Sequence, residues 1–161
     1  MKPLSLFFLL GVSLYCQSNF ILPQEHNRFV DTMQKELRKT SRSLIIITDH
    51  LHSSWLKNEI KKRAKKNVPI IVVTQGDDDT ESLALYQNIT IRRIQAINSP
   101  YYRGILSFSL LYFDDHTGCW GSTSLDDTTL QHDVSFFTCK GNTEFAALAQ
   151  MLLLQSVPYL K

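Results

Sequence analysis

The stretch of sequence that decides the fold reads ILSFSLLYFDDHTGCWGSTS and covers residues 105–124. An apolar run, residues 105–113, is followed by a turn-forming segment, residues 114–118, and by a second, short apolar run at residues 119–120. Apolar runs on either side of a turn rich in Asp and Gly are typical of a β-hairpin. We therefore predict a hairpin whose second strand ends at a corner of small residues, positions 121–122.

The first strand of this hairpin carries two serines on an otherwise apolar face. Side chains alternate along a strand, so Ser107 and Ser109 are expected to point the same way as Leu111 and Phe113. Two hydroxyl groups directed into the same space indicate a polar site at this part of the sheet.

The length and composition are those of one globular domain. The chain has 161 residues, of which 43% are hydrophobic and 20% are charged, so it can bury a full core and is not a disordered protein. The net charge of +2 is too small to indicate a nucleic-acid-binding protein by itself.

The N-terminus has the pattern of a secretory signal peptide. A single lysine precedes about a dozen apolar residues, positions 4–15, and small polar residues follow. We expect a signal peptide over residues 1–18, cleaved between positions 16 and 18, and a periplasmic or secreted mature chain. The alternative is a membrane anchor at the N-terminus, either the uncleaved segment or a lipid on Cys16.

Export changes the interpretation of the other two cysteines. Cys119 and Cys139 each fall in a predicted strand, and an even number of cysteines in an oxidising compartment favours a disulfide. We predict a bond between them; two buried free thiols are the alternative.

The remaining elements follow from hydrophobic periodicity, turn residues and capping residues. Two buried strands enclose a helix, residues 43–48, 54–66 and 68–74, which predicts a βαβ unit with parallel strands. The other predicted elements are helices at 27–39, at 81–87 and from Asn142 onward, strands at 89–94 and 134–139, and a polar loop at 126–132.

This order of elements resembles a single-repeat phospholipase D superfamily domain, of the type found in small exported bacterial endonucleases. The resemblance covers nearly all of the mature chain and implies one domain over residues 25–161. The implied fold is α/β, a phospholipase D-like mixed sheet flanked by helices on both faces. A homodimer is implied by the resemblance alone.

The family signature is His-x-Lys, four residues, Asp, then Gly-Ser-x-Asn, and a later acidic residue. Here Asp114, Gly121 and Ser122 stand at the right separation, and Asp133 matches the later acidic residue. The other three signature positions are serines, since Ser107 stands for the histidine, Ser109 for the lysine and Ser124 for the asparagine.

These replacements remove the groups that the family chemistry needs. In an active member the histidine attacks phosphorus and forms a phosphohistidine, and the lysine neutralises the phosphate oxygens. A serine without an adjacent base is a poor nucleophile, and a serine carries no charge. We expect a degenerate motif that is non-catalytic or weakly active by the family route and retains a phosphate-sized pocket.

Other residues could have rebuilt a site. His52, His132 and Asp133 border the expected pocket and could act as base, nucleophile or metal ligands, although their spacing matches no metal motif and no cofactor is expected. A Ser107–His132–Asp133 triad is disfavoured because adjacent residues in an extended segment point in opposite directions. The lysine-rich helix could follow a phosphate backbone or simply face solvent.

Three functions remain open from the sequence. The first is an exported, degenerate domain that binds a phosphodiester or a nucleic acid. The second is a phosphodiesterase or nuclease that uses His52 and His132. The third is a scaffold that binds a protein partner of the cell envelope.

Overall fold

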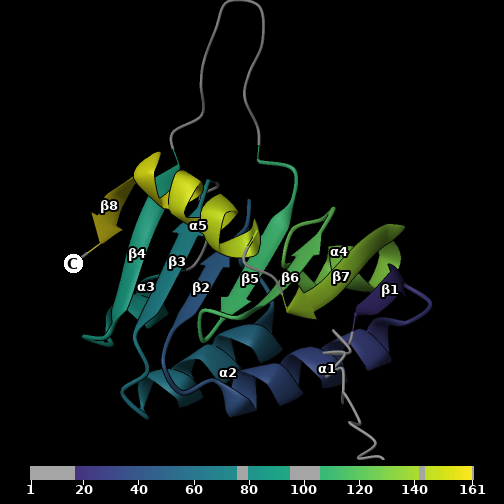
Figure 1. Ribbon diagram of the computed structural model, residues 1–161, viewed down its shortest axis with the longest axis horizontal. Helices are drawn as coiled ribbons and strands as arrows, with labels where there is room; N and C mark the ends of the chain where they lie inside the picture. The colour runs from purple at the N-terminus through teal and green to yellow at the C-terminus, as the bar shows by residue number, and fades with distance from the viewer. Residues whose placement is uncertain (1–16, 76–79, 95–105, 142–143, 161) are drawn as a thin grey trace, which may run out of the picture.

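The computed structural model describes residues 17–75, 80–94, 106–141 and 144–160. These residues form one eight-stranded mixed sheet with the order β1-β7-β6-β5-β2-β3-β4-β8 (Figure 1). The expected α/β fold, a mixed sheet with helices on both faces, is confirmed. The strands are β1 Ser18–Leu22, β2 Leu44–Ile47, β3 Ile70–Thr74, β4 Ile89–Ile94, β5 Ser109–Phe113, β6 Thr117–Gly121, β7 Ser135–Gly141 and β8 Ser156–Leu160.

The middle of the sheet is the predicted βαβ unit. β2 and β3 pair in parallel, β3 and β4 also pair in parallel, and β5 runs antiparallel to β2 on its other side. We call the end of the sheet at which β2, β3 and β4 finish the carboxyl end, and the opposite end the amino end. From the pairing directions, β6 also finishes at the carboxyl end, and β1 runs toward that end from Ser18, which is level with Ile46 of β2.

The helices cover the two faces unequally. The helices are α1 His26–Lys39, α2 Ser54–Ala64, α3 Glu81–Ala84, α4 Asp127–His132 and α5 Glu144–Leu154. The first four contribute Phe29, Leu56, Leu83 and Leu130 to the larger core on one face. The strongly apolar α5 packs alone on the other face, through Phe145, Ala149 and Leu152 (Figure 1).

The hairpin is present and shorter at its start than expected. β5 begins at Ser109 and pairs with β6 in the register Ser109 to Gly121. Ser107 is exposed and precedes the strand, whereas Ser109 is fully buried. The prediction that Ser107 and Ser109 point into the same space from one strand is therefore wrong. The strand begins only at Ser109, and Ser107 lies before it.

Three elements were not predicted. Residues 126–132, expected as a polar loop, contain α4, because the Asp126 carboxylate accepts hydrogen bonds from the backbone N–H groups of Thr128 and Thr129 and starts a helix. β1 and β8 form the two edges of the sheet. β8 contains Pro158, which is tolerated because β8 is an edge strand.

Some predictions fall on residues outside the described ones. The signal peptide lies outside them up to residue 16, and so do Ile105 and the expected helix cap Asn142. β1 begins at Ser18, inside the expected signal peptide and before residue 25, so the sheet includes residues that the expected domain omits. Among the described residues, no helix has the length and apolar character that a membrane span requires.

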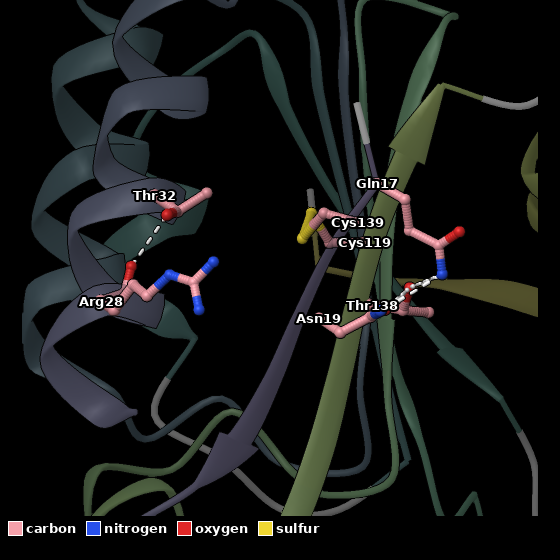
Figure 2. Close-up of a disulfide and its surroundings, with 7 residues drawn as sticks. All are labelled: Gln17, Asn19, Arg28, Thr32, Cys119, Thr138 and Cys139. Carbon is pink, nitrogen blue, oxygen red and sulfur yellow. Dashed lines mark hydrogen bonds between the residues drawn. A yellow bond between two sulfur atoms is a disulfide. The ribbon is translucent and has the colours of Figure 1, made fainter. Parts of the chain in front are cut away.

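A disulfide joins Cys119 on β6 to Cys139 on β7 (Figure 2). The two residues are directly opposite each other in the strand register, and both are buried. The predicted pairing is therefore present, and it links the hairpin to β7.

Gly121 contacts a buried aromatic ring and has no room for a side chain. A Cβ at this position would overlap the ring of Phe137, which is opposite Gly121 in the register and 1% exposed. We expect Gly121→Ala to lower the free energy of unfolding by about 1–3 kcal/mol, the usual cost of overpacking, measured by urea denaturation. The double variant Gly121→Ala/Phe137→Leu should lose less than the sum of the single variants; strict additivity would contradict this contact.

Candidate functional site

The candidate site lies at the carboxyl end of the sheet, where two loops meet. The loop after β2, residues 48–53, and the loop after β6, residues 122–126, are joined by a parallel bridge between Leu51 and Leu125. The Leu125 carbonyl oxygen accepts hydrogen bonds from the backbone N–H groups of His52 (3.1 Å) and Ser53 (3.0 Å). The two loops are therefore held as one unit.

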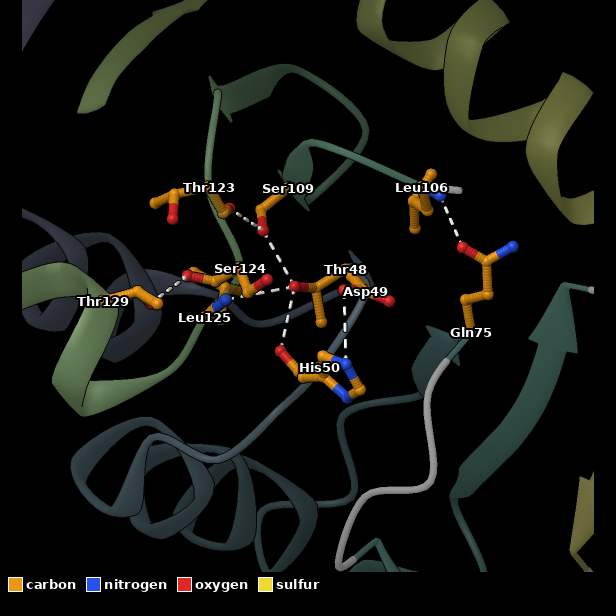
Figure 3. A network of polar contacts seen from close by, with 10 residues as sticks. All are labelled: Thr48, Asp49, His50, Gln75, Leu106, Ser109, Thr123, Ser124, Leu125 and Thr129. Atoms are coloured by element: carbon orange, nitrogen blue, oxygen red, sulfur yellow. Dashed lines mark hydrogen bonds and ion pairs between the residues drawn. The ribbon is translucent and has the colours of Figure 1, made fainter. Parts of the chain in front are cut away.

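A buried hydroxyl network fixes this unit to the sheet (Figure 3). Thr48 and Ser109 are both fully buried, and their hydroxyl oxygens lie 2.8 Å apart. The Ser109 hydroxyl donates to the Thr123 carbonyl oxygen at 2.5 Å. The Thr48 hydroxyl oxygen accepts from the backbone N–H of Leu125 at 3.1 Å and also lies 3.0 Å from the His50 carbonyl oxygen.

Ser109 stands at the signature position of the family lysine. Its role here is structural, because its hydroxyl connects the loop after β2 to the loop after β6. Its single proton is used by Thr123, and its oxygen faces Thr48. A group that is fully buried and hydrogen-bonded in this way is not available to a ligand.

The other signature serines are more accessible. Ser107 and Ser122 are exposed, and Ser124 is half-buried. The Ser122 hydroxyl oxygen accepts a hydrogen bond from the backbone N–H of Phe136 at 3.2 Å, and the Ser124 carbonyl oxygen faces the Thr129 hydroxyl at 3.3 Å. Ser107 and Ser122 are thus the most exposed of the signature serines.

Two histidines and one aspartate stand in the loop after β2. The Nε2 atom of His50 lies 3.3 Å from an Asp49 carboxylate oxygen, and the rings of His50 and His52 are 5.7 Å apart. The Nδ1 atom of His50 is buried and forms no hydrogen bond with the described residues. Asp49 was not among the predicted site residues, although its position directly after a buried strand was an available signal.

His132 and Asp133 are exposed at the end of α4. His132 is the last residue of that helix, so the prediction that His132 and Asp133 lie in one extended segment and point in opposite directions is wrong. Within the described ranges, no three His, Cys, Asp or Glu side chains come together as a metal site, so a metal-binding His52–His132–Asp133 group is not formed.

The charge of these loops is negative. Residues 48–53, 106–108 and 122–134 contain four aspartates, Asp49, Asp126, Asp127 and Asp133, and neither lysine nor arginine. Asp126 caps α4, and an Asp127 carboxylate oxygen accepts from the backbone N–H of Ser54 at 2.9 Å, at the start of α2. These loops offer hydroxyl and imidazole groups to a phosphate, and they contain no lysine or arginine that would neutralise its charge.

Asp114 lies at the amino end of the sheet, a full strand away from Ser109. Its carboxylate accepts hydrogen bonds from the backbone N–H groups of Ser41 (3.0 Å), Arg42 (2.7 Å) and Ser43 (3.1 Å). Desolvation raises the pKa of Asp114, but these backbone hydrogen bonds and nearby His116 outweigh it, so the pKa is lowered. Asp114 therefore anchors the α1–β2 loop.

This anchor predicts a stability change that depends on pH. Because the folded-state pKa of Asp114 is lowered, its contribution is complete above its ordinary value of 3.8 and is lost as the pH falls through the folded-state pKa. We expect Asp114→Asn, which keeps the shape and tolerates the left-handed backbone (φ 50°), to cost about 1–2 kcal/mol at pH 7 and progressively less below pH 4. Urea denaturation between pH 2.5 and 7 checks this, with exposed Asp31→Asn as control; a difference that grows on acidification would contradict it.

The comparisons with known proteins agree with this geometry at the level of the fold. No protein-family model and no curated protein sequence matches the chain. NucT from Helicobacter pylori superimposes with a TM-score of 0.81 and 16% identity over 90% of this chain and 99% of that one. Nuc from Salmonella typhimurium, described as a phospholipase D family member, gives a TM-score of 0.67 and 14% identity over 91% and 99%.

A larger protein contains the same unit. Phosphatidylserine synthase from Haemophilus influenzae superimposes with a TM-score of 0.66 and 11% identity, over 90% of this chain and 40% of that one. At these identities the shared property is the arrangement of helices and strands, and the expected resemblance is confirmed at that level. The chain has the phospholipase D fold.

Proposed function

We propose that this chain is an exported, degenerate phospholipase D-fold protein that acts by binding and does not cleave phosphodiesters through a phosphohistidine. The observation that carries the proposal is the state of Ser109. It stands where the family signature has a lysine, it is fully buried, and its hydroxyl is bonded to Thr48 and Thr123.

The charge of the site supports binding of a protein partner there over binding of a nucleic acid. A nucleic-acid surface neutralises phosphates with lysine and arginine, and the described loops at the carboxyl end provide neither. Their aspartates and exposed hydroxyls suit a polar partner of the cell envelope. The homodimer implied by the family resemblance remains a prediction.

The test measures turnover and ligand binding on the same purified chain. We expect no hydrolysis of bis-p-nitrophenyl phosphate above the uncatalysed rate, with or without EDTA. Inorganic phosphate is titrated into the protein while the amide NMR shifts of Ser107 and Ser122 are recorded. Saturating shifts at these residues would indicate a retained anion site, and unchanged shifts would indicate that none is retained. Turnover that persists in EDTA and is abolished by one histidine substitution would overturn the proposal.

A second candidate is a phosphodiesterase built on the histidines of the loop after β2. The observation in its favour is the contact between His50 and Asp49, with the His52 ring close by. An imidazole oriented by a carboxylate is a plausible general base. If turnover is found, His50→Ala and His52→Ala should abolish it, whereas activity lost only in His132→Ala would place the chemistry near α4.

A further inference from the structure

The amino end of the sheet differs from the candidate site in charge, and the proposed function does not use it. Both α1 and α2 end here, as do the loops that lead into β2, β3 and β4. We propose that this end of the molecule is a docking surface for an anionic lipid bilayer.

Basic residues are concentrated around this end. Ten of the seventeen lysines and arginines lie between residues 35 and 66, against three of the fifteen acidic residues. Those in the last turns of α1 and α2 and in the loops that follow are Arg38, Lys39, Arg42, Lys61, Lys62, Arg63, Lys65 and Lys66.

Several of these charges are not neutralised by the protein. Lys39 pairs with Glu36, and Lys62 pairs with Glu59. In the described part of the chain, Arg42, Lys61, Lys65 and Lys66 form no ion pair, and Arg42, Lys65 and Lys66 are exposed.

The nearby carboxylates do little to offset this charge. Asp114 is occupied by the backbone N–H groups of residues 41–43. Asp115 is exposed and accepts a hydrogen bond from the Ser43 hydroxyl at 3.1 Å. One exposed acid therefore faces three exposed, unpaired basic residues in the adjoining loops.

Hydrogen bonds hold the loops of this end in fixed positions relative to one another. The Arg63 guanidinium donates to the Arg38 carbonyl oxygen at 2.8 Å and joins the ends of α2 and α1. The Asn88 side-chain amide donates to the carbonyl oxygens of Ala64 (3.1 Å) and Val68 (2.6 Å) and joins the α3–β4 loop to the α2–β3 loop. The charges are therefore presented on a pre-organised surface.

An exposed leucine accompanies these charges. Leu85 follows α3 in the loop that Asn88 ties to the end of α2, and its side chain is 84% exposed. A large apolar side chain next to lysines is typical of surfaces that insert into the interface of a bilayer.

These observations favour a bilayer over a nucleic acid as the occupant. Basic side chains suit both, since each lysine or arginine near an anionic membrane adds to the attraction. The exposed Leu85 side chain gains apolar contacts from lipid and none from a phosphate backbone.

The first test compares charge-neutralised variants of the full chain, so that the N-terminal segment contributes equally to each. We expect Arg42→Gln/Lys65→Gln/Lys66→Gln to weaken partitioning onto phosphatidylglycerol-containing vesicles at low salt by about a hundredfold. The matched control Arg28→Gln/Lys35→Gln/Lys57→Gln removes the same charge from earlier turns of α1 and α2 and should weaken it by less than about fivefold.

The second test reports the orientation of the protein. Leu85→Trp should be quenched by lipids brominated on their acyl chains, whereas Leu154→Trp should not. Leu154 is equally exposed, at 88%, and lies where α5 ends, at the carboxyl end of the sheet.

Three results would overturn the proposal. Equal losses of vesicle partitioning in the two triple variants would show that the membrane attracts the overall charge of the protein and not this particular surface. Equal quenching at the two tryptophans would show no preferred orientation. A loss of duplex DNA binding by the Arg42, Lys65 and Lys66 variant with unchanged vesicle partitioning would make this end a nucleic-acid surface.

Discussion

Reduction of the Cys119–Cys139 disulfide is expected to lower the free energy of unfolding by about 3 kcal/mol. The bond closes a loop with a sequence separation of 20, so breaking it restores conformational freedom to the unfolded chain. It also joins opposite positions on β6 and β7, inside the larger core. Urea denaturation with and without dithiothreitol measures the effect.

The control for this experiment is a chain that cannot form the bond. Cys119→Ala/Cys139→Ala should unfold at the same urea concentration with and without reductant. A Cys16→Ser background removes the third thiol and prevents exchange. A change below about 0.5 kcal/mol on reduction of the parent chain would show that the cross-link does not stabilise the sheet.

Ser109→Lys is expected to cost about 3–5 kcal/mol, because it places an ammonium group at a fully buried position. The change also removes the hydroxyl that bonds to the Thr123 carbonyl oxygen and faces Thr48. Restoring the family lysine should therefore destabilise this chain and should not restore its chemistry.

The adjacent signature position is the matched control. Ser107 is exposed, so Ser107→Lys adds the same charge two residues away and should change the free energy of unfolding by less than about 0.5 kcal/mol. The double variant Ser107→His/Ser109→Lys should remain inactive toward bis-p-nitrophenyl phosphate. Turnover by a stable double variant would show that the position of residue 109 can open to substrate.

The centre of the fold could be predicted because its signals are local. β2 and β3 are apolar on both faces, which indicates a covered central strand, and α1 carries Phe29, Met33 and Leu37 at helical spacing. The hairpin followed from its turn, and the disulfide followed from the expected compartment and the cysteine count.

The missed elements are stabilised by contacts that are distant in sequence. β1 is a short strand that pairs only with β7, and its sequence lies beside the expected cleavage site. α4 has only six residues, begins with the poor helix formers Asp127, Thr128 and Thr129, and depends on its Asp126 cap. Local periodicity carries no information on either.

The candidate site was only partly predictable for the same reason. The spacing of the signature suggested that Ser107 and Ser109 were equivalent hydroxyls, but the start of β5 separates an exposed one from a buried one. Thr48, whose hydroxyl lies 2.8 Å from that of Ser109 and accepts from Leu125, comes from the loop after β2 and has no marker in the sequence. Asp114 belongs to the signature but anchors a loop at the far end of the sheet.

The two edge strands are the first and the last strands of the chain, and this placement sets the order in which the molecule can be completed. Thr138 on β7 donates to Asn19 on β1 across 119 residues, so β1 cannot pair until β7 has been synthesised. Until the two strands pair, β7 presents unpaired backbone groups to other chains. Truncation at either terminus should therefore promote strand-to-strand aggregation before it affects the central strands.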